Sequence, residues 1–257
     1  MTAVFDNYAR YYDLLYRDKD YAGEAAYVAG LIKEQLPHAA TVLELGCGTG
    51  THAVLLAKLG FHVHGVDMSE AMVAQANARK AALEPELAAR LTFGLGDARS
   101  VRTGASYDAV ISLFHVVSYQ STNADLAANF ATARTHLRAG GLFLFDTWYG
   151  PAVLRDPPVT RIKRLEDEAI SVVRLAEPVM HYNENLVDVH YEVQMQDKAT
   201  GAREQLTEVH RMRYLFAPEL EMAANAAQMH TAFKYAWMTR AQPDERSWGA
   251  VFGMLAD

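Results

Sequence analysis

The sequence has very little cysteine and no long apolar run. Its 257 residues include one cysteine, Cys47, which excludes an internal disulfide and a metal site built from several cysteines. No stretch approaches the roughly 18 apolar residues of a membrane-spanning helix. The first residues also lack the basic segment and following apolar segment of a secretory leader. We therefore expect a cytoplasmic protein with no metal site and no membrane contact.

Basic residues are outnumbered by acidic ones. The chain has 24 Lys and Arg against 31 Asp and Glu, which gives a formal net charge of −7. Because proteins that bind nucleic acids usually present a basic face, we expect no nucleic-acid partner. Hydrophobic residues make up 51% of the chain, which is typical of a globular protein with a large core.

Strand-like and helix-like segments alternate over the first 150 residues. Apolar runs predict strands at residues 41–46, 61–67, 91–97, 107–114 and 142–148. Helical spacing predicts helices that begin near Thr51 and end at Gly60, that begin at Glu70 after a possible N-cap at Ser69, and that run over residues 123–141. Strands that alternate with helices indicate an α/β fold with a doubly wound parallel sheet covered on both faces.

The alternation changes after Trp148. Four strand-like stretches with no helix between them lie within residues 160–216, followed by a helix at 217–229 and terminal strands at 231–238 and 247–255. We expect an α/β core with an N-terminal helical cap, an antiparallel inset and a return to the core. These parts correspond to residues 1–150, 151–216 and 217–257. The inset should cover the carboxyl edge of the sheet, where open α/β folds bind ligands.

A glycine-rich loop follows the first predicted strand. "LELGCGTGTH" (43–52) places Gly46, Gly48 and Gly50 in the order G-x-G-x-G, whereas dinucleotide sites use G-x-G-x-x-G to bring a pyrophosphate to a helix N-terminus. The shorter spacing predicts a tight turn on which a ligand can lie without a diphosphate. Asp67 ends the second strand, where its carboxylate can accept hydrogen bonds from both hydroxyls of a ribose.

Two further carboxylates accompany the loop. Asp97 ends the third strand, where it can accept from an adenine amino group, although a turn role is the alternative. Glu44 is a charge within an apolar strand. We expect Glu44 to hold the glycine loop or the cationic amino-acid part of a ligand.

Several motifs together resemble those of a known family. "VLELGCGTG", "GVDMS", "GDA" and "LRAGGLFLFD", in this order and spacing, resemble the motifs of class I S-adenosylmethionine (SAM)-dependent methyltransferases over residues 40–150 and the closing strands. The resemblance implies a Rossmann-like, seven-stranded, mostly parallel sheet with a reversed terminal hairpin, and SAM as the cofactor. The cofactor-binding residues that we predict are Tyr21, Glu44, Gly46, Cys47, Gly48, Gly50, Asp67, Met68, Asp97, Ala98 and Leu113.

A closer resemblance concerns the methyl acceptor. "YDLLYRDKDYAGEA", "SLFHVVSY", "WYGPAVL" and the inset resemble bacterial amino-sugar N-methyltransferases, which include N,N-dimethyltransferases acting on nucleotide-linked sugars. The resemblance implies that Tyr16 lies near the acceptor amine, that Tyr119 faces the acceptor and that Tyr21 covers the cofactor. We expect His115 to collect a proton. The predicted catalytic residues are thus Tyr16, His115 and Tyr119.

The predicted acceptor-binding residues are Trp148, Arg161 and Arg213. Arg161 belongs to a basic run with Arg155, Lys163 and Arg164 that could grip the diphosphate of a sugar nucleotide, with a solvated face of the inset as the alternative.

Two other functions remain open. An O-methyltransferase would use His115 as the general base for a small hydroxylated acceptor, and a noncatalytic regulator would bind SAM without transfer. A homodimer is possible.

Overall fold

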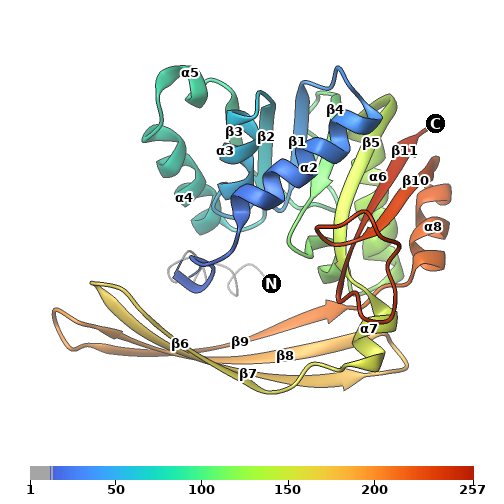
Figure 1. Ribbon diagram of the computed structural model, residues 1–257. Helices are drawn as coiled ribbons and strands as arrows, with labels where there is room; N and C mark the ends of the chain where they lie inside the picture. Colours follow the sequence, from blue (N-terminus) through green and yellow to red (C-terminus); the bar gives the residue numbers. More distant parts are fainter. Residues whose placement is uncertain (1–11, 13) are drawn as a thin grey trace.

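A seven-stranded sheet forms the centre of the protein. The computed structural model describes residue 12 and residues 14–257; the start of the predicted N-terminal cap lies outside the described residues. The strand order is β10-β11-β5-β4-β1-β2-β3 (Figure 1). The strands are β1 (Thr41–Leu45), β2 (His62–Asp67), β3 (Leu91–Leu95), β4 (Tyr107–Ser112), β5 (Leu137–Trp148), β10 (Met229–Ala236) and β11 (Gly249–Ala256).

The sheet is parallel from β3 to β5, and β11 runs antiparallel to both of its neighbours. The predicted doubly wound, mostly parallel sheet with a reversed terminal strand is therefore confirmed. The structure also has helices α2 (Tyr21–Gln35), α3 (Thr51–Lys58), α4 (Glu70–Ala81), α5 (Pro85–Ala88), α6 (Asn123–His136), α7 (Gly150–Arg155) and α8 (Ala217–Ala226), and the 3₁₀-helix η1 (Val116–Tyr119).

Helices cover both faces of the sheet. Val42 belongs to a core with residues of α2 and α3, whereas its neighbour Leu43 belongs to a second core with Phe130 of α6 and Leu220 of α8. Successive residues of a strand point to opposite faces. Burial of both faces explains why the strands are continuous apolar runs.

The helix predicted at 123–141 is wrong at its end. α6 ends at His136 and β5 begins at Leu137, which pairs with Tyr107 before an irregularity in the ladder. Gly140 lies within this irregular part of the strand with φ of 69°. This glycine therefore serves a strand distortion, within the stretch that we expected to be helical.

Another helix also ends earlier than expected. The helix predicted at 217–229 ends at Ala226, because Gln228 adopts a left-handed φ of 56° and Met229 begins to pair with Ala256. The short helix α7 was not expected. It occupies the start of the segment that we assigned to the inset.

The inset is a separate four-stranded antiparallel sheet in the order β6-β7-β8-β9, as predicted. Its strands are β6 (Arg161–Glu166), β7 (Ile170–His181), β8 (Leu186–Asp197) and β9 (Arg203–Arg213). Figure 1 shows this sheet below the core, with the segment that precedes α2 between the two. Leu14 and Leu15 of that segment pack on Val172 and Val193 of the inset and on Met72 of α4. Burial of these apolar side chains holds the three parts together.

No helix in the described part of the chain is long and apolar enough to cross a membrane.

Candidate active site

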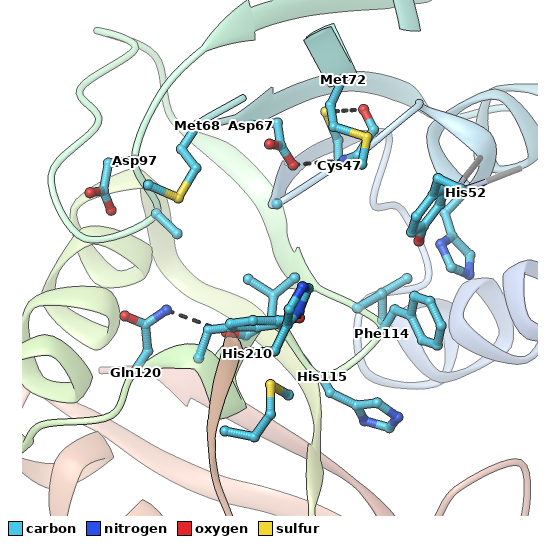
Figure 2. A pocket seen from close by; sticks show the side chains of 18 of the residues that line it. Cys47, His52, Asp67, Met68, Met72, Asp97, Phe114, His115, Gln120 and His210 are labelled. Carbon is cyan, nitrogen blue, oxygen red and sulfur yellow. Dashed lines mark hydrogen bonds between the residues drawn. The ribbon is translucent and has the colours of Figure 1, made fainter. Parts of the chain in front are cut away.

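A cavity lies between the core sheet, the segment before α2 and the inset (Figure 2). Most of the predicted site residues line it, although they come from six separate stretches of the chain. Those that line it are Tyr16, Gly46, Cys47, Gly48, Asp67, Met68, Asp97, Ala98, Leu113, His115, Tyr119 and Trp148.

The glycine loop forms one wall of the cavity. The backbone N–H groups of Gly46 and Cys47 both donate to the carbonyl of Val66, at 2.8 and 2.9 Å, which fixes the loop to the end of β2. A Cβ at Gly48 would have no protein atom within 4 Å, and the residue has φ of 53°. Because Gly48 lines the cavity, the open space beside it allows a ligand to lie on the backbone.

The other loop residues have different surroundings. A Cβ at Gly50 would lie 2.8 Å from the ring of Phe93. Gly50 does not line the cavity, so it serves close packing of the loop on β3. Cys47 is buried, and burial raises the pKa of its thiol well above the ordinary value, so this cysteine is not a reactive thiolate.

Asp67 lines the cavity, and its carboxylate already accepts hydrogen bonds from the backbone. Oδ2 accepts from the N–H of Gly48 and Oδ1 from the N–H of Ser69, each at 2.9 Å. Burial raises the pKa of Asp67. A carboxylate has about four lone-pair sites, so two remain for a ligand. Two acceptor sites on one rigid carboxylate suit a vicinal diol such as a ribose.

Asp97 is held by an arginine that the sequence analysis did not identify. Arg99 donates from Nε and Nη2 to Asp97, at 2.9 and 2.5 Å, and from Nη1 to Asp125 at 2.9 Å. The Arg99 hydrogen bonds lower the pKa of Asp97. Asp97 also accepts from the backbone N–H of Arg99, as expected of a turn residue, and it lines the cavity. Its contact with an adenine amino group stays a prediction.

Glu44 lies outside the cavity lining, buried beside the glycine loop. Its Oε1 lies 4.0 Å from Nδ1 of His52, which itself lines the cavity. Burial, with a smaller contribution from the charge of Asp67, raises the pKa of Glu44 to about 8. Glu44 is therefore largely protonated near neutral pH in the folded protein.

Replacing Glu44 by glutamine should remove a pH dependence of stability. Between the ordinary pKa of 4.5 and the folded value of about 8, the folded state keeps a proton that the unfolded chain has released. The free energy of unfolding then falls as pH rises, by up to ~1.4 kcal/mol per pH unit, and levels off above the folded pKa. Denaturant titrations over this pH range should show a shallower slope in Glu44→Gln and an unchanged slope in a control, Glu86→Gln, at an exposed site. An unchanged slope in Glu44→Gln would contradict the assignment.

Tyr21 begins α2 and does not line the cavity. Its ring packs edge-on against His52, with the ring centroids 4.9 Å apart. His52 Nε2 lies 2.8 Å from a carboxylate oxygen of Glu24, and Lys19 forms an ion pair with the same carboxylate. The start of α2 is thus tied to α3 directly beside the glycine loop. Tyr21 affects the cavity through His52.

The loop after β4 holds two residues with a left-handed backbone. The strand ends at Ser112, two residues earlier than predicted, and Phe114 and His115 have φ of 63° and 64°. A left-handed backbone is unfavourable for residues other than glycine, and where such residues adopt it they are often at functional sites. The ring of Tyr16 packs edge-on against Phe114 at 4.8 Å, so Tyr16 closes the cavity over this loop.

His115 has a buried carboxylate partner that the sequence analysis missed. The ring Nδ1 of His115 lies 2.7 Å from Oδ2 of Asp146, and the backbone N–H of His115 donates to the same oxygen at 3.1 Å. Asp146 lies near the end of β5 and is 1% exposed. The contact brings an imidazole and a buried carboxylate together beside the cavity. No local pattern indicates the pair, because His115 is in the loop after β4 and Asp146 is on β5.

Tyr119 also has partners that were not predicted. Its Oη lies 2.7 Å from Nδ1 of His210, and Nε2 of His210 lies 3.2 Å from Glu208. Both partners are on β9 of the inset. Tyr191 of β8 packs edge-on against the His210 ring at 4.9 Å.

The predicted acceptor-binding residues fall into two groups. Trp148 lines the cavity, and its ring centroid is 6.4 Å from that of His115. Arg161 is exposed at the start of β6, and Arg213 is buried in an ion pair with Glu219 of α8 at 2.6 Å. The structure brings neither arginine to the cavity, because Arg213 is committed to the helix that follows and Arg161 lies on the outside of the inset.

Comparison with known proteins agrees with this architecture. Residues 42–141 match a family described as "Methyltransferase domain". The chain is 32% identical to the dTDP-3-amino-3,4,6-trideoxy-alpha-D-glucopyranose N,N-dimethyltransferase of Streptomyces venezuelae, over 88% of this chain and 92% of that protein. It is similar to the crystal structure of Streptomyces venezuelae DesVI, with a TM-score of 0.80 and 26% identity over 97% of this chain and 98% of that one.

A further similar structure contains the cofactor. CalS10 from Micromonospora echinaspora, an amino pentose methyltransferase solved with SAM bound, has a TM-score of 0.75 and 26% identity over 96% of each chain. The residues of this cavity fit SAM: the open space at Gly48 and the two remaining acceptor sites of Asp67 suit a nucleoside that lies on a glycine loop. The chain belongs to the class I SAM-dependent methyltransferases and is related to the dTDP-amino-sugar N,N-dimethyltransferases.

Proposed function

We propose that this methyltransferase methylates an amino group on a nucleotide-linked sugar. The observation that carries the proposal is the extent of the similarity to the Streptomyces venezuelae dimethyltransferase, which covers 88% of this chain and so includes much of the inset as well as the SAM-binding core. We infer that the inset, residues 151–216, covers the acceptor. Similarity in the part that covers the acceptor supports a shared class of acceptor more strongly than similarity in the cofactor loop does.

The reaction depends more on correct placement of the methyl donor and the acceptor than on a covalent intermediate with the protein. Bound SAM would supply a methyl group on a sulfonium: a nucleophile aligned with the carbon–sulfur bond forms a bond to the methyl carbon, and the sulfur leaves as a neutral thioether. In this chain Tyr16, Phe114, Leu113 and Trp148 line the cavity with apolar surface. Such surroundings disfavour an ammonium ion and so favour the neutral amine, which has the lone pair that attacks. Alignment and exclusion of water can supply several kcal/mol of the rate enhancement.

The proton released from the methylated nitrogen needs a destination. His115 lines the cavity, and its Nδ1 lies 2.7 Å from the buried carboxylate of Asp146, so a basic nitrogen and a carboxylate stand together at the cavity wall. We assign the proton-collecting role to this pair. The same pair supports a second candidate function, O-methylation, because a hydroxyl acceptor needs a general base during attack.

A mass-shift assay tests the proposed acceptor class. Purified protein is incubated with SAM and a mixture of nucleotide-linked sugars, some with an amino group and some with only hydroxyls. The proposal predicts that amino-bearing members gain one or two methyl groups. It is wrong if only sugars without an amino group are methylated.

His115→Ala separates the two chemistries. With an amine that is neutral in the cavity, turnover should fall about tenfold or less, because attack does not need a base. With a hydroxyl acceptor, loss of a general base should cost about 10²- to 10⁴-fold. Turnover is compared with His190→Ala, a control at an exposed position of β8, and SAM affinity is measured in each variant. Near-complete loss of transfer with SAM binding intact would favour the O-methyltransferase.

A further inference from the structure

A buried polar chain connects the core to the inset at the cavity wall. Tyr119 of η1 contacts Nδ1 of His210 at 2.7 Å, and Nε2 of His210 contacts Glu208 at 3.2 Å. His210 and Glu208 are 4% and 5% exposed. Tyr119 and His210 both line the cavity, and Figure 2 shows His210 among the lining side chains. The edge-on ring of Tyr191 fixes the imidazole from another side.

The chemistry of the three groups sets the direction of their hydrogen bonds. An ionised carboxylate only accepts, so the Nε2–H of His210 donates to Glu208. The remaining ring nitrogen, Nδ1, is then an acceptor, and the Tyr119 hydroxyl donates to it. Burial raises the pKa of Tyr119 well above its ordinary value, so the phenol keeps the proton that it donates. The Tyr119 oxygen is left with lone pairs only.

We infer that His210, oriented by Glu208, is a positioning residue that makes the Tyr119 hydroxyl a hydrogen-bond acceptor toward the cavity. The inference rests on the proposed amine substrate. An N–H of that amine donates to the Tyr119 oxygen, which leaves the nitrogen lone pair free to attack the methyl group. If the Tyr119 oxygen instead accepted a hydrogen bond from Nδ1 of His210, the Tyr119 O–H would be directed at this lone pair and would block the attack. His210 thus acts through Tyr119.

A double-mutant cycle tests this coupling. His210→Leu should lower kcat for the amino-sugar nucleotide about tenfold, with SAM affinity by calorimetry unchanged, because it releases the Tyr119 hydroxyl. In a Tyr119→Phe background the same substitution should change kcat less than about twofold, since residues that act as one unit are not additive. His190→Leu, at an exposed position of β8, is the control for an inset histidine. Additive losses from His210→Leu and Tyr119→Phe would overturn the inference.

A conservative variant separates positioning from packing. In His210→Asn, the side-chain oxygen can take the place of Nδ1 and accept from Tyr119, so most of the lost turnover should return. A variant His210→Asn that folds and binds SAM but is as slow as His210→Leu would overturn the inference.

The tautomer can be measured without any substrate. Nitrogen-15 NMR of histidine-labelled protein, with His210 assigned by comparison with His210→Asn, should show Nε2 protonated and Nδ1 unprotonated. A protonated Nδ1 would overturn the inference whatever the substrate is. Failure of the proposed function appears elsewhere, in a wild-type protein that methylates no amino-bearing sugar nucleotide, and the two failures are therefore distinguishable.

Discussion

Asp67→Ala should weaken SAM binding by about 10- to 100-fold, the effect of removing hydrogen bonds to a charged group worth roughly 1.5–3 kcal/mol. The variant loses the two acceptor sites that face the cavity. It also leaves the N–H groups of Gly48 and Ser69 without their present acceptor, so the glycine loop is less firmly held. Calorimetric titration with SAM measures the effect.

Asp67→Asn is the matched variant for this experiment. Asparagine keeps one oxygen for the backbone N–H groups but has no negative charge, so its affinity should lie between those of the wild type and Asp67→Ala. Thermal unfolding without SAM shows whether each variant is folded. A folded Asp67→Ala with wild-type affinity would show that the carboxylate does not hold the cofactor.

Gly48→Ala should lower SAM affinity at least about tenfold. The added Cβ meets no protein atom within 4 Å, so it enters open space beside a loop that lines the cavity. A ligand that lies on this backbone would have to move away from it. The left-handed φ of 53° adds a folding cost of about 1–2 kcal/mol for a residue with a side chain.

A second glycine separates the two effects of that substitution. Gly104 has φ of 73° and also has no atom within 4 Å of a built Cβ, but it is exposed and does not line the cavity. Gly104→Ala should therefore lose similar stability and bind SAM normally. Equal SAM affinities for Gly48→Ala and Gly104→Ala would remove Gly48 from the cofactor site.

The core and the glycine wall of the cavity could be predicted because their signals are local. Apolar runs that end in glycine or aspartate locate the strands and their carboxyl ends, and parallel strands place those ends at one edge. Gly46, Gly48, Asp67 and Asp97 therefore came together in the structure as expected. The end of α6 at His136 was not predictable in this way, because it is decided by pairing of Leu137 with Tyr107 on another strand.

The remaining parts of the site depend on contacts distant in the sequence. Asp146 of β5 contacts His115 in the loop after β4, and His210 of the inset contacts Tyr119. Neither pair has a fixed spacing that a single sequence reveals. Arg213 illustrates the opposite error. We predicted Arg213 to bind the acceptor, but the tertiary structure shows that it is paired with Glu219.

The most direct test of the account is a competition between two matched acceptors. Purified enzyme, SAM and equal amounts of a nucleotide-linked amino sugar and of the same sugar nucleotide with a hydroxyl in place of the amine are incubated together. Mass spectrometry then follows both products. The account predicts that methyl groups appear on the amino sugar, at its nitrogen, and that the hydroxyl analogue is not methylated. Methylation of the hydroxyl analogue in preference to the amino sugar would contradict it.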